Sequence, residues 1–100
     1  MITVYRVMTA VDYKGQRQRE LFYTENREEA ENRYIEAQRK VNRFGEEKGL
    51  KVTEIKHNRN FYTTFADGSQ KKKPYTGAKA ELSVIECDDY FLDLANYPVH

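Results

Sequence analysis

The sequence predicts a single α+β domain in which one long helix packs against one antiparallel sheet. Three observations lead to this fold class. A stretch between Asn26 and Gly49 carries apolar residues at helical spacing, segments on both sides of it alternate like strands, and no βαβ repeat or linker interrupts the chain. The expected order is an N-terminal β-hairpin, the helix, and then a three-stranded antiparallel meander, all within residues 1–100.

The helix is the best-defined element. Its apolar residues recur at spacings of four and three and form one stripe, made of Ala30, Tyr34, Ala37, Val41 and Phe44. Asn26 followed three residues later by Glu29 is the spacing of a capping box, which predicts the first turn. Lys48 before Gly49 predicts the end, because glycine takes the left-handed conformation that follows many helices. A helix of about 21 residues would be about 32 Å long and could cross a small sheet.

The segments before the helix predict a hairpin. Residues 2–13 and 17–24 alternate branched, aromatic and polar side chains, and Lys14-Gly15-Gln16 offers a tight turn between them. The sequence does not decide which face of the hairpin is buried, because a change of one residue in the loop moves Phe22 to the other side of the sheet.

The segments after the helix predict the meander. Three strands are expected, with a turn at His57–Asn60, a second turn at Asp67-Gly68 and an exposed loop over residues 69–78; the strands are 50–57, 61–66 and 79–87. The tail from Asp88 to His100 is apolar enough to pack back as a short helix or an irregular strand. The helix stripe would then cover one sheet face and leave the other to solvent or to a partner.

Composition indicates a thin core and a reducing compartment. Charged residues make up 33% of the chain, above the roughly 25% of an ordinary domain. A lone cysteine, Cys87, cannot form an internal disulfide, and no long apolar run or signal peptide is present, so we expect a cytoplasmic protein without membrane contact. Basic residues dominate from Lys56 to Lys79 and acidic residues from Glu81 to Asp93. These two segments either neutralise each other across adjacent strands or contact partners.

The motifs of catalysis are missing. The sequence has no glycine-rich phosphate loop, no paired histidines or cysteines at ligand spacing, and no nucleophile elbow. The two histidines, His57 and His100, have no evident partners, and neighbouring aspartates make Cys87 a poor nucleophile. The aspartates after Cys87 match no known cation loop. We therefore expect no enzymatic activity, no cofactor and no metal site.

Two features suggest binding. Lys71, Lys72 and Lys73 stand beside Tyr75, and the hairpin tip adds three further basic residues, Lys14, Arg17 and Arg19. Basic loops next to aromatic rings can hold phosphates and stack bases, although a lysine run also simply keeps a domain soluble. The second feature is the number of tyrosines outside the helix, which either serve a protein interface or fill the half-wet edges of a small core.

The joint between hairpin and helix resembles a known group of proteins. Residues Phe22 to Tyr34 (Phe-Tyr-Thr-Glu-Asn-Arg-Glu-Glu-Ala-Glu-Asn-Arg-Tyr) join a strand with an aromatic and threonine end to an acidic helix start. This passage is similar to the same joint in small phage and mobile-element proteins, including some anti-CRISPR and other anti-defence inhibitors. The resemblance implies a non-enzymatic protein that occupies a site on a host effector. Those families share no binding motif, so it assigns no functional residue.

These observations give two hypotheses. The first is a small protein that docks on a protein partner and inhibits it, through residues Tyr62, Lys71, Lys72, Lys73, Tyr75, Asp88, Asp89 and Tyr90. The alternative is a nucleic-acid-binding module that uses Lys14, Arg17, Arg19 and the Lys71–Lys73 loop. A homodimer formed by pairing of an exposed strand edge stays open as well. The sequence does not identify the partner.

Overall fold

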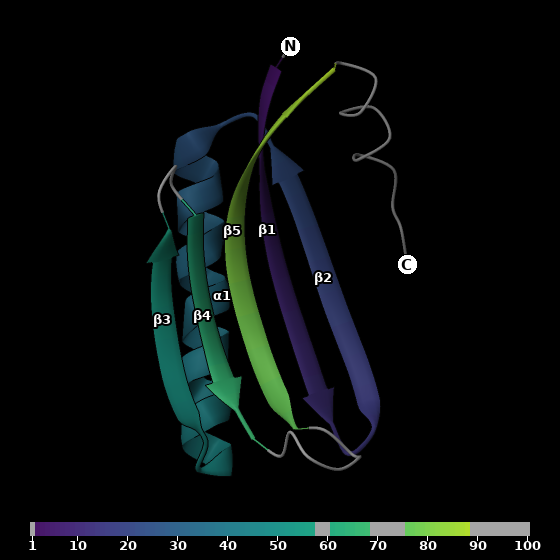
Figure 1. Cartoon of the computed structure of the whole chain (residues 1–100), viewed down its shortest axis with the longest axis vertical. Helices are drawn as coiled ribbons and strands as arrows, with labels where there is room; N and C mark the ends of the chain where they lie inside the picture. The colour runs from purple at the N-terminus through teal and green to yellow at the C-terminus, as the bar shows by residue number, and fades with distance from the viewer. Residues whose placement is uncertain (1, 58–60, 69–75, 89–100) are drawn as a thin grey trace.

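A long helix lies along one side of a five-stranded antiparallel sheet (Figure 1). This arrangement comes from a computed structural model, which describes residues 2–57, 61–68 and 76–88. The elements follow one another as β1 (Ile2–Tyr13), β2 (Gln16–Thr24), α1 (Arg27–Lys48), β3 (Lys51–His57), β4 (Phe61–Asp67) and β5 (Gly77–Cys87).

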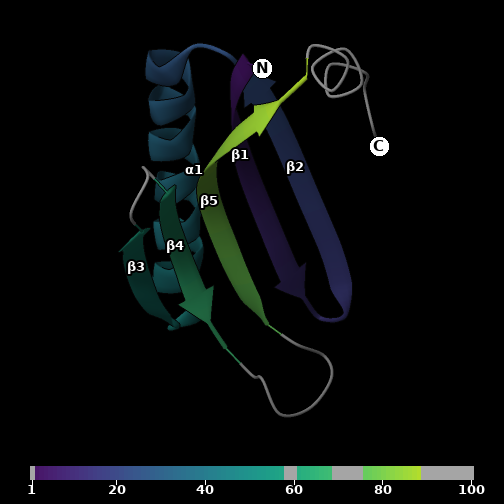
Figure 2. The same ribbon diagram turned by 45° about the horizontal axis from the view of Figure 1, so that its top comes forward.

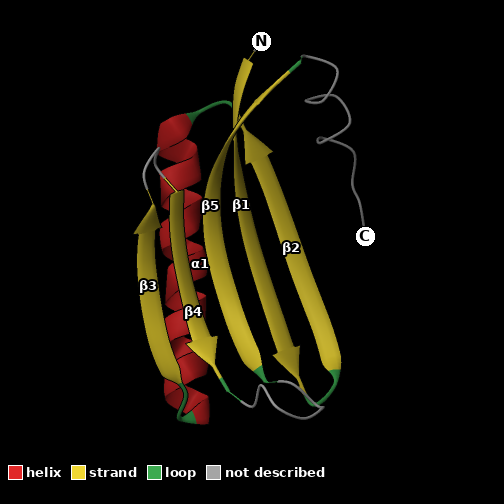
Figure 3. Cartoon of the chain, viewed as in Figure 1, coloured by secondary structure: helices red, strands yellow, loops and turns green. Residues whose placement is uncertain are grey.

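The hairpin and the meander join into one sheet with the strand order β2-β1-β5-β4-β3 (Figure 3). The joint is the antiparallel pairing of β1 with β5, which runs from Ile2 opposite Cys87 to Asp12 opposite Gly77. The predicted fold of hairpin, helix and meander is therefore confirmed. The two outer strands are β2 and β3, and the centre of the sheet is β5.

The hairpin turn is shorter than the predicted one. It consists of Lys14 and Gly15 alone, with φ angles of 53° and 79°, and Gln16 already pairs with Tyr13 as the first residue of β2. Two consecutive positive φ angles are typical of the two-residue type I′ turn, whose twist matches that of the strands. This turn settles the register that the sequence left open: Val7 lies opposite Phe22, and both pack against the core under α1.

The strand β5 begins earlier than predicted. The expected loop ran to Ala78, but Gly77 already pairs with Asp12 of β1 and with Asp67 of β4. The predicted tail structure falls in residues 89–100, which lie outside the described residues, as do 58–60 and 69–75.

The helix begins and ends where its capping residues predict. The side chain of Asn26 accepts a hydrogen bond of 3.0 Å from the backbone N–H of Glu29, and Gly49 follows the last turn with a φ of 68°. A cap of this kind contributes about 1 kcal/mol to helix stability.

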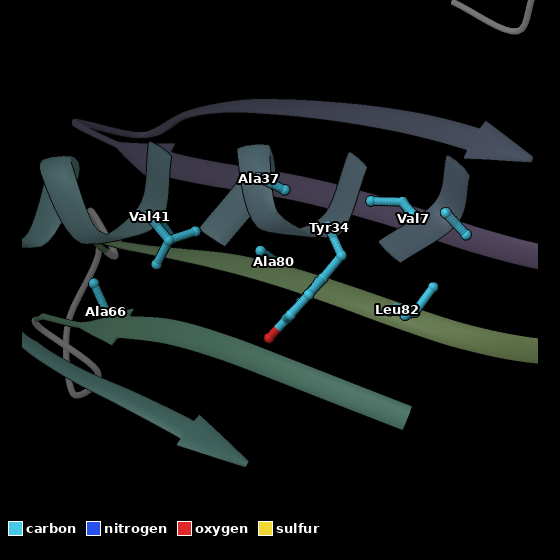
Figure 4. Close-up of a cluster of buried hydrophobic side chains, with 9 residues drawn as sticks. Val7, Tyr34, Ala37, Val41, Ala66, Ala80 and Leu82 are labelled. Carbon is cyan, nitrogen blue, oxygen red and sulfur yellow. The ribbon is translucent and has the colours of Figure 1, made fainter. Parts of the chain in front are cut away.

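The core lies between α1 and the three central strands (Figure 4). The predicted stripe is confirmed, with Ala30, Tyr34, Ala37 and Val41 all buried. The ring of Tyr34 reaches across the sheet, and its hydroxyl shares a hydrogen bond of 2.7 Å with the buried hydroxyl of Thr64. Burial raises the pKa of Tyr34, and the bond to Thr64 only partly offsets this shift.

The stripe continues to one residue that the sequence pattern did not identify. Gly45 is buried, and a Cβ at this position would clash with the side chain of Val52 and lie 3.4 Å from the Cβ of Ala66. The missing side chain lets the last turns of α1 lie close to β3 and β4.

Candidate binding surface

The two faces of the sheet differ in what covers them. Because side chains alternate along a strand, the register assigns each residue to the face under α1 or to the opposite face, which we call the open face. No described helix covers the open face (Figure 2). The described open-face residues around its centre are Met8, Ala10, Asp12, Arg17, Arg19, Leu21, Ile55, Thr63, Phe65, Asp67, Gly77, Lys79 and Glu81.

The open face contains a hollow of about 550 Å³, formed by four neighbouring strands. Its lining includes Ala10 and Gly77, which carry little or no side chain, together with the larger side chains of Met8 and Phe65. A volume of this size lies within the range of ligand pockets, about 300–1,000 Å³. The hollow is therefore large enough to receive side chains of a partner.

Most charges around the hollow are paired. Arg17 holds Asp12 at 2.8 Å across the hairpin. Glu81 is held by Lys79 at 3.1 Å and by Arg6 at 3.4 Å, and it also accepts a hydrogen bond of 3.1 Å from the hydroxyl of Ser83. These interactions pair four of the charged side chains that line the hollow: Asp12, Arg17, Lys79 and Glu81.

Burial and the neighbouring charges act in opposite directions on the pKa of Glu81. Burial alone would raise the pKa of this carboxyl group, but the hydrogen bond and charge of Lys79, with the contributions of Ser83 and Arg6, outweigh it and lower the pKa below its ordinary value. Glu81 is therefore ionised at neutral pH, where it forms ion pairs with Lys79 and Arg6.

Two charges at the hollow have no ion-pair partner among the described residues. Arg19 projects from β2, and Asp67 projects from β4 on the other side. They are of opposite sign and separated by the width of β1 and β5. A partner with complementary charges could engage both.

A row of five paired residues, three of them apolar, crosses the same face. Leu21, Met8, Glu81, Thr63 and Ile55 stand directly opposite one another from β2 to β3. Leu21 is 40% exposed and Ile55 is 38% exposed, so the row ends in a large apolar side chain at both sheet edges. On the other side of the molecule, Ile35 of α1 is 44% exposed.

The predicted protein-binding residues are only partly described by the structure. Tyr62 lies on the face under α1, where its ring packs against Tyr34 with the centroids 5.6 Å apart. Asp88 is exposed just after the end of β5. The other predicted positions, Lys71, Lys72, Lys73, Tyr75, Asp89 and Tyr90, lie outside the described residues.

The predicted basic residues of the hairpin are all exposed, but they do not share one surface. Arg17 and Arg19 line the hollow, whereas Lys14 lies at the turn with its ammonium group 5.3 Å from the centre of the Tyr13 ring. Lys48 approaches the same ring to 4.4 Å. The hydrogen bond and charge of Lys48, together with the charge of Lys14, lower the pKa of Tyr13.

The residues considered for catalysis stand apart from the hollow. Cys87 is the last residue of β5, half-buried and opposite Ile2, and His57 is the last residue of β3. Within 2–57, 61–68 and 76–88, no three histidine, cysteine or acidic residues come together in a way that could hold a metal ion. In the same ranges, no helix is long and apolar enough to cross a membrane.

Comparison with known proteins gives no further guide to the site. No protein-family model, no curated protein and no solved structure matches this chain.

Proposed function

We propose that this protein is a non-enzymatic binding protein that holds a protein partner on the open face of its sheet. The observation that carries the proposal is the hollow of about 550 Å³ on the sheet face that no described helix covers, bordered by charged residues, with the exposed apolar side chains of Leu21 and Ile55 on the same face.

The chemistry of the open face supports a protein partner. Methionine, aromatic and arginine side chains are enriched at protein interfaces, and Met8, Phe65 and Arg19 all line the hollow. Ion pairs already hold Asp12 and Glu81, so these carboxylates need not rearrange when a partner arrives. Such preorganisation lowers the entropic cost of binding.

The biological role that we propose is inhibition of a host effector. This part of the proposal rests on the resemblance of residues Phe22 to Tyr34 to phage anti-defence proteins, whose mode of action is to occupy a site on their target. A protein that inhibits in this way needs a rigid surface and no catalytic group.

A matched pair of variants tests the binding surface. Ile55 and Ile35 are the same residue with nearly the same exposure, but Ile55 lies on the open face and Ile35 on the outer side of α1. The tagged protein, Ile55→Glu and Ile35→Glu are each incubated with nuclease-treated lysate of the natural host, and the captured proteins are identified by mass spectrometry.

We expect Ile55→Glu to lose a stoichiometric host protein that both the parent protein and Ile35→Glu retain. Thermal midpoints measured for all three proteins verify that both variants fold. If Ile35→Glu loses the partner and Ile55→Glu keeps it, the open face is not the binding surface.

Nucleic-acid binding is a second candidate, favoured by one topological observation. The turn of the hairpin, the last turn of α1 and the start of β3 lie at one end of the sheet (Figure 1). These three parts of the chain contain Lys14, Lys48 and Lys51, respectively. Gly68 and Thr76, which flank the segment with Lys71–Lys73, contact each other at this same end. The fold thus brings Lys14, Lys48 and Lys51, which come from three different elements, to one end of the sheet.

Salt dependence distinguishes this candidate from the first. For a phosphate-binding surface, the joint replacement of Lys14, Arg17 and Arg19 by Gln should flatten the slope of log affinity against log salt for an oligonucleotide. The expected change in slope is about 0.7–0.9 for each phosphate that is no longer bound. The matched control replaces three exposed helix residues, Arg27, Arg33 and Arg39, by Gln. Equal slopes for the parent and both variants would exclude these three residues as phosphate contacts, and a flat slope in the parent would remove nucleic acid as the ligand.

A further inference from the structure

The outer side of β2 is a long unpaired strand edge. This strand of nine residues pairs with β1 on one side, and no described strand pairs with its other side. In a two-residue hairpin turn, the closing residues Tyr13 and Gln16 exchange backbone hydrogen bonds, and paired positions then alternate along the strands. It follows that the odd-numbered residues of β2, from Arg17 to Tyr23, direct their backbone N–H and C=O groups away from the sheet.

We propose that a second copy of this chain pairs with this edge, antiparallel and with Leu21 on the twofold axis. Backbone groups of odd-numbered residues can only bond to odd-numbered residues of the copy, which limits the registers. The registers that pair at least seven residues of β2 with the copy place the twofold axis at Arg19, Glu20 or Leu21. An axis at Arg19 or at Glu20 sets that charge against its own copy, which is destabilising. With the axis at Leu21, no two residues of like charge lie opposite each other.

The open-face side chains suit this register. Leu21 would meet Leu21 of the second copy, and the two side chains, each 40% exposed in the monomer, would cover one another. Arg19 would stand opposite Tyr23 of the second copy, an arrangement that permits a cation–π contact. Beyond the paired strands, Arg17 would be level with Glu25 of the copy.

The side chains on the helix side are complementary as well. Glu20 would lie opposite Phe22 of the second copy, and the guanidinium group of Arg33 sits 4.4 Å from the centre of that ring. The carboxylate would therefore face a cation of the copy in addition to Lys40 of its own chain, which approaches it to 3.6 Å. Charge complementarity on both faces of the strand identifies the second copy as the partner.

The dimer would also change the candidate binding surface. Two open faces would join into one continuous sheet, and Arg17 and Arg19, which line the hollow, would lie at the junction. The copy would thus supply one flank of the hollow. This inference does not depend on a protein partner being bound.

Solution mass tests the dimer. The molar mass of the full chain is measured by light scattering after size exclusion over a range of concentrations, for the parent, Leu21→Arg and Ile55→Arg. Ile55 is the matched control, because it is an equally exposed aliphatic residue on the other edge strand. We expect a dimer for the parent and for Ile55→Arg, and for Leu21→Arg a monomer that still unfolds cooperatively. A monomeric parent, or a dimer that persists in Leu21→Arg, would overturn the proposal.

Disulfide trapping tests the register. With Cys87 replaced by Ala, Leu21→Cys should form an intermolecular disulfide on mild oxidation, since paired Cα atoms about 5.5 Å apart suit a disulfide. Glu20→Cys and Ile55→Cys serve as comparisons. More efficient linkage of Glu20→Cys would place the axis at Glu20 and contradict the register, and equal linkage of all three would indicate random collision. The dimer is measured on the purified chain, where Ile55→Arg should remain a dimer, and the proposed function is measured by capture from lysate, where Ile55→Glu should lose the host protein. Failure of the dimer and failure of the proposed function therefore give different results.

Discussion

The two faces of this sheet are made of alternating residues of the same strands, yet their central residues differ in burial. On the covered face, Val7, Ala80 and Leu82 are almost completely buried beneath α1. Their immediate neighbours in sequence on the open face, Met8 and Glu81, keep part of their surface in water. The difference shows that α1 buries the centre of one face, while the centre of the other face keeps half-buried residues at the same level of the sheet.

The largest effect should come from the covered face. Leu82 is 2% exposed in the centre of the core, so Leu82→Ala should lower the free energy of unfolding by about 2–5 kcal/mol. Met8 pairs with Glu81, the sequence neighbour of Leu82, but lies on the open face. Met8→Ala should lower the free energy of unfolding clearly less, because Met8 is only half-buried. Urea denaturation of both variants measures the two costs. Equal costs would mean that the open face is as tightly packed as the core.

The next effect concerns the buried hydrogen bond between α1 and β4. Tyr34→Phe leaves the hydroxyl of Thr64 buried without its partner, which should cost about 1–3 kcal/mol. The double variant Tyr34→Phe/Thr64→Val removes both hydroxyl groups and should recover part of that loss. A double variant that is less stable than Tyr34→Phe would show that the hydrogen bond is not the reason for the cost.

The smallest effect belongs to the open face and depends on pH. The pKa of Glu81 is lowered in the folded protein, so its interactions stabilise the fold above the ordinary carboxyl value of 4.5 and are lost as the pH falls below it. Glu81→Gln should therefore be less stable than the parent at pH 7, with a difference that shrinks in acid. Thermal midpoints measured from pH 7 to pH 3 test this, and a constant difference would contradict the assigned role of Glu81.

The fold could be predicted because its signals are local. Asn26 and Glu29 mark the start of α1, Gly49 marks its end, and the stripe between them needs no knowledge of the rest of the chain. Gly45 could not be recognised as part of the stripe, because its role depends on the close approach of Val52 and Ala66 from other elements.

The candidate surface could not be predicted because it depends on register. A shift of one residue reverses the face of every side chain in a strand, and the two-residue turn at Lys14 that fixes β1 against β2 has no unique sequence signature. Tyr62 shows the consequence: it belongs to the covered face, while Thr63 beside it lines the hollow. Arg19 and Lys79 lie on either side of Ala10 only because β1 pairs with both β2 and β5.

The open face as a binding surface can be tested most directly with methyl NMR. The chain has four isoleucines, of which Ile2, Ile55 and Ile85 occupy open-face positions and Ile35 lies on the outer side of α1. Protein labelled at its isoleucine methyl groups is titrated with the host protein that it captures. We expect the Ile55 signal to shift or broaden while the Ile35 signal stays in place. A response of Ile35 with an unchanged Ile55 would contradict the assignment of the open face as the binding surface.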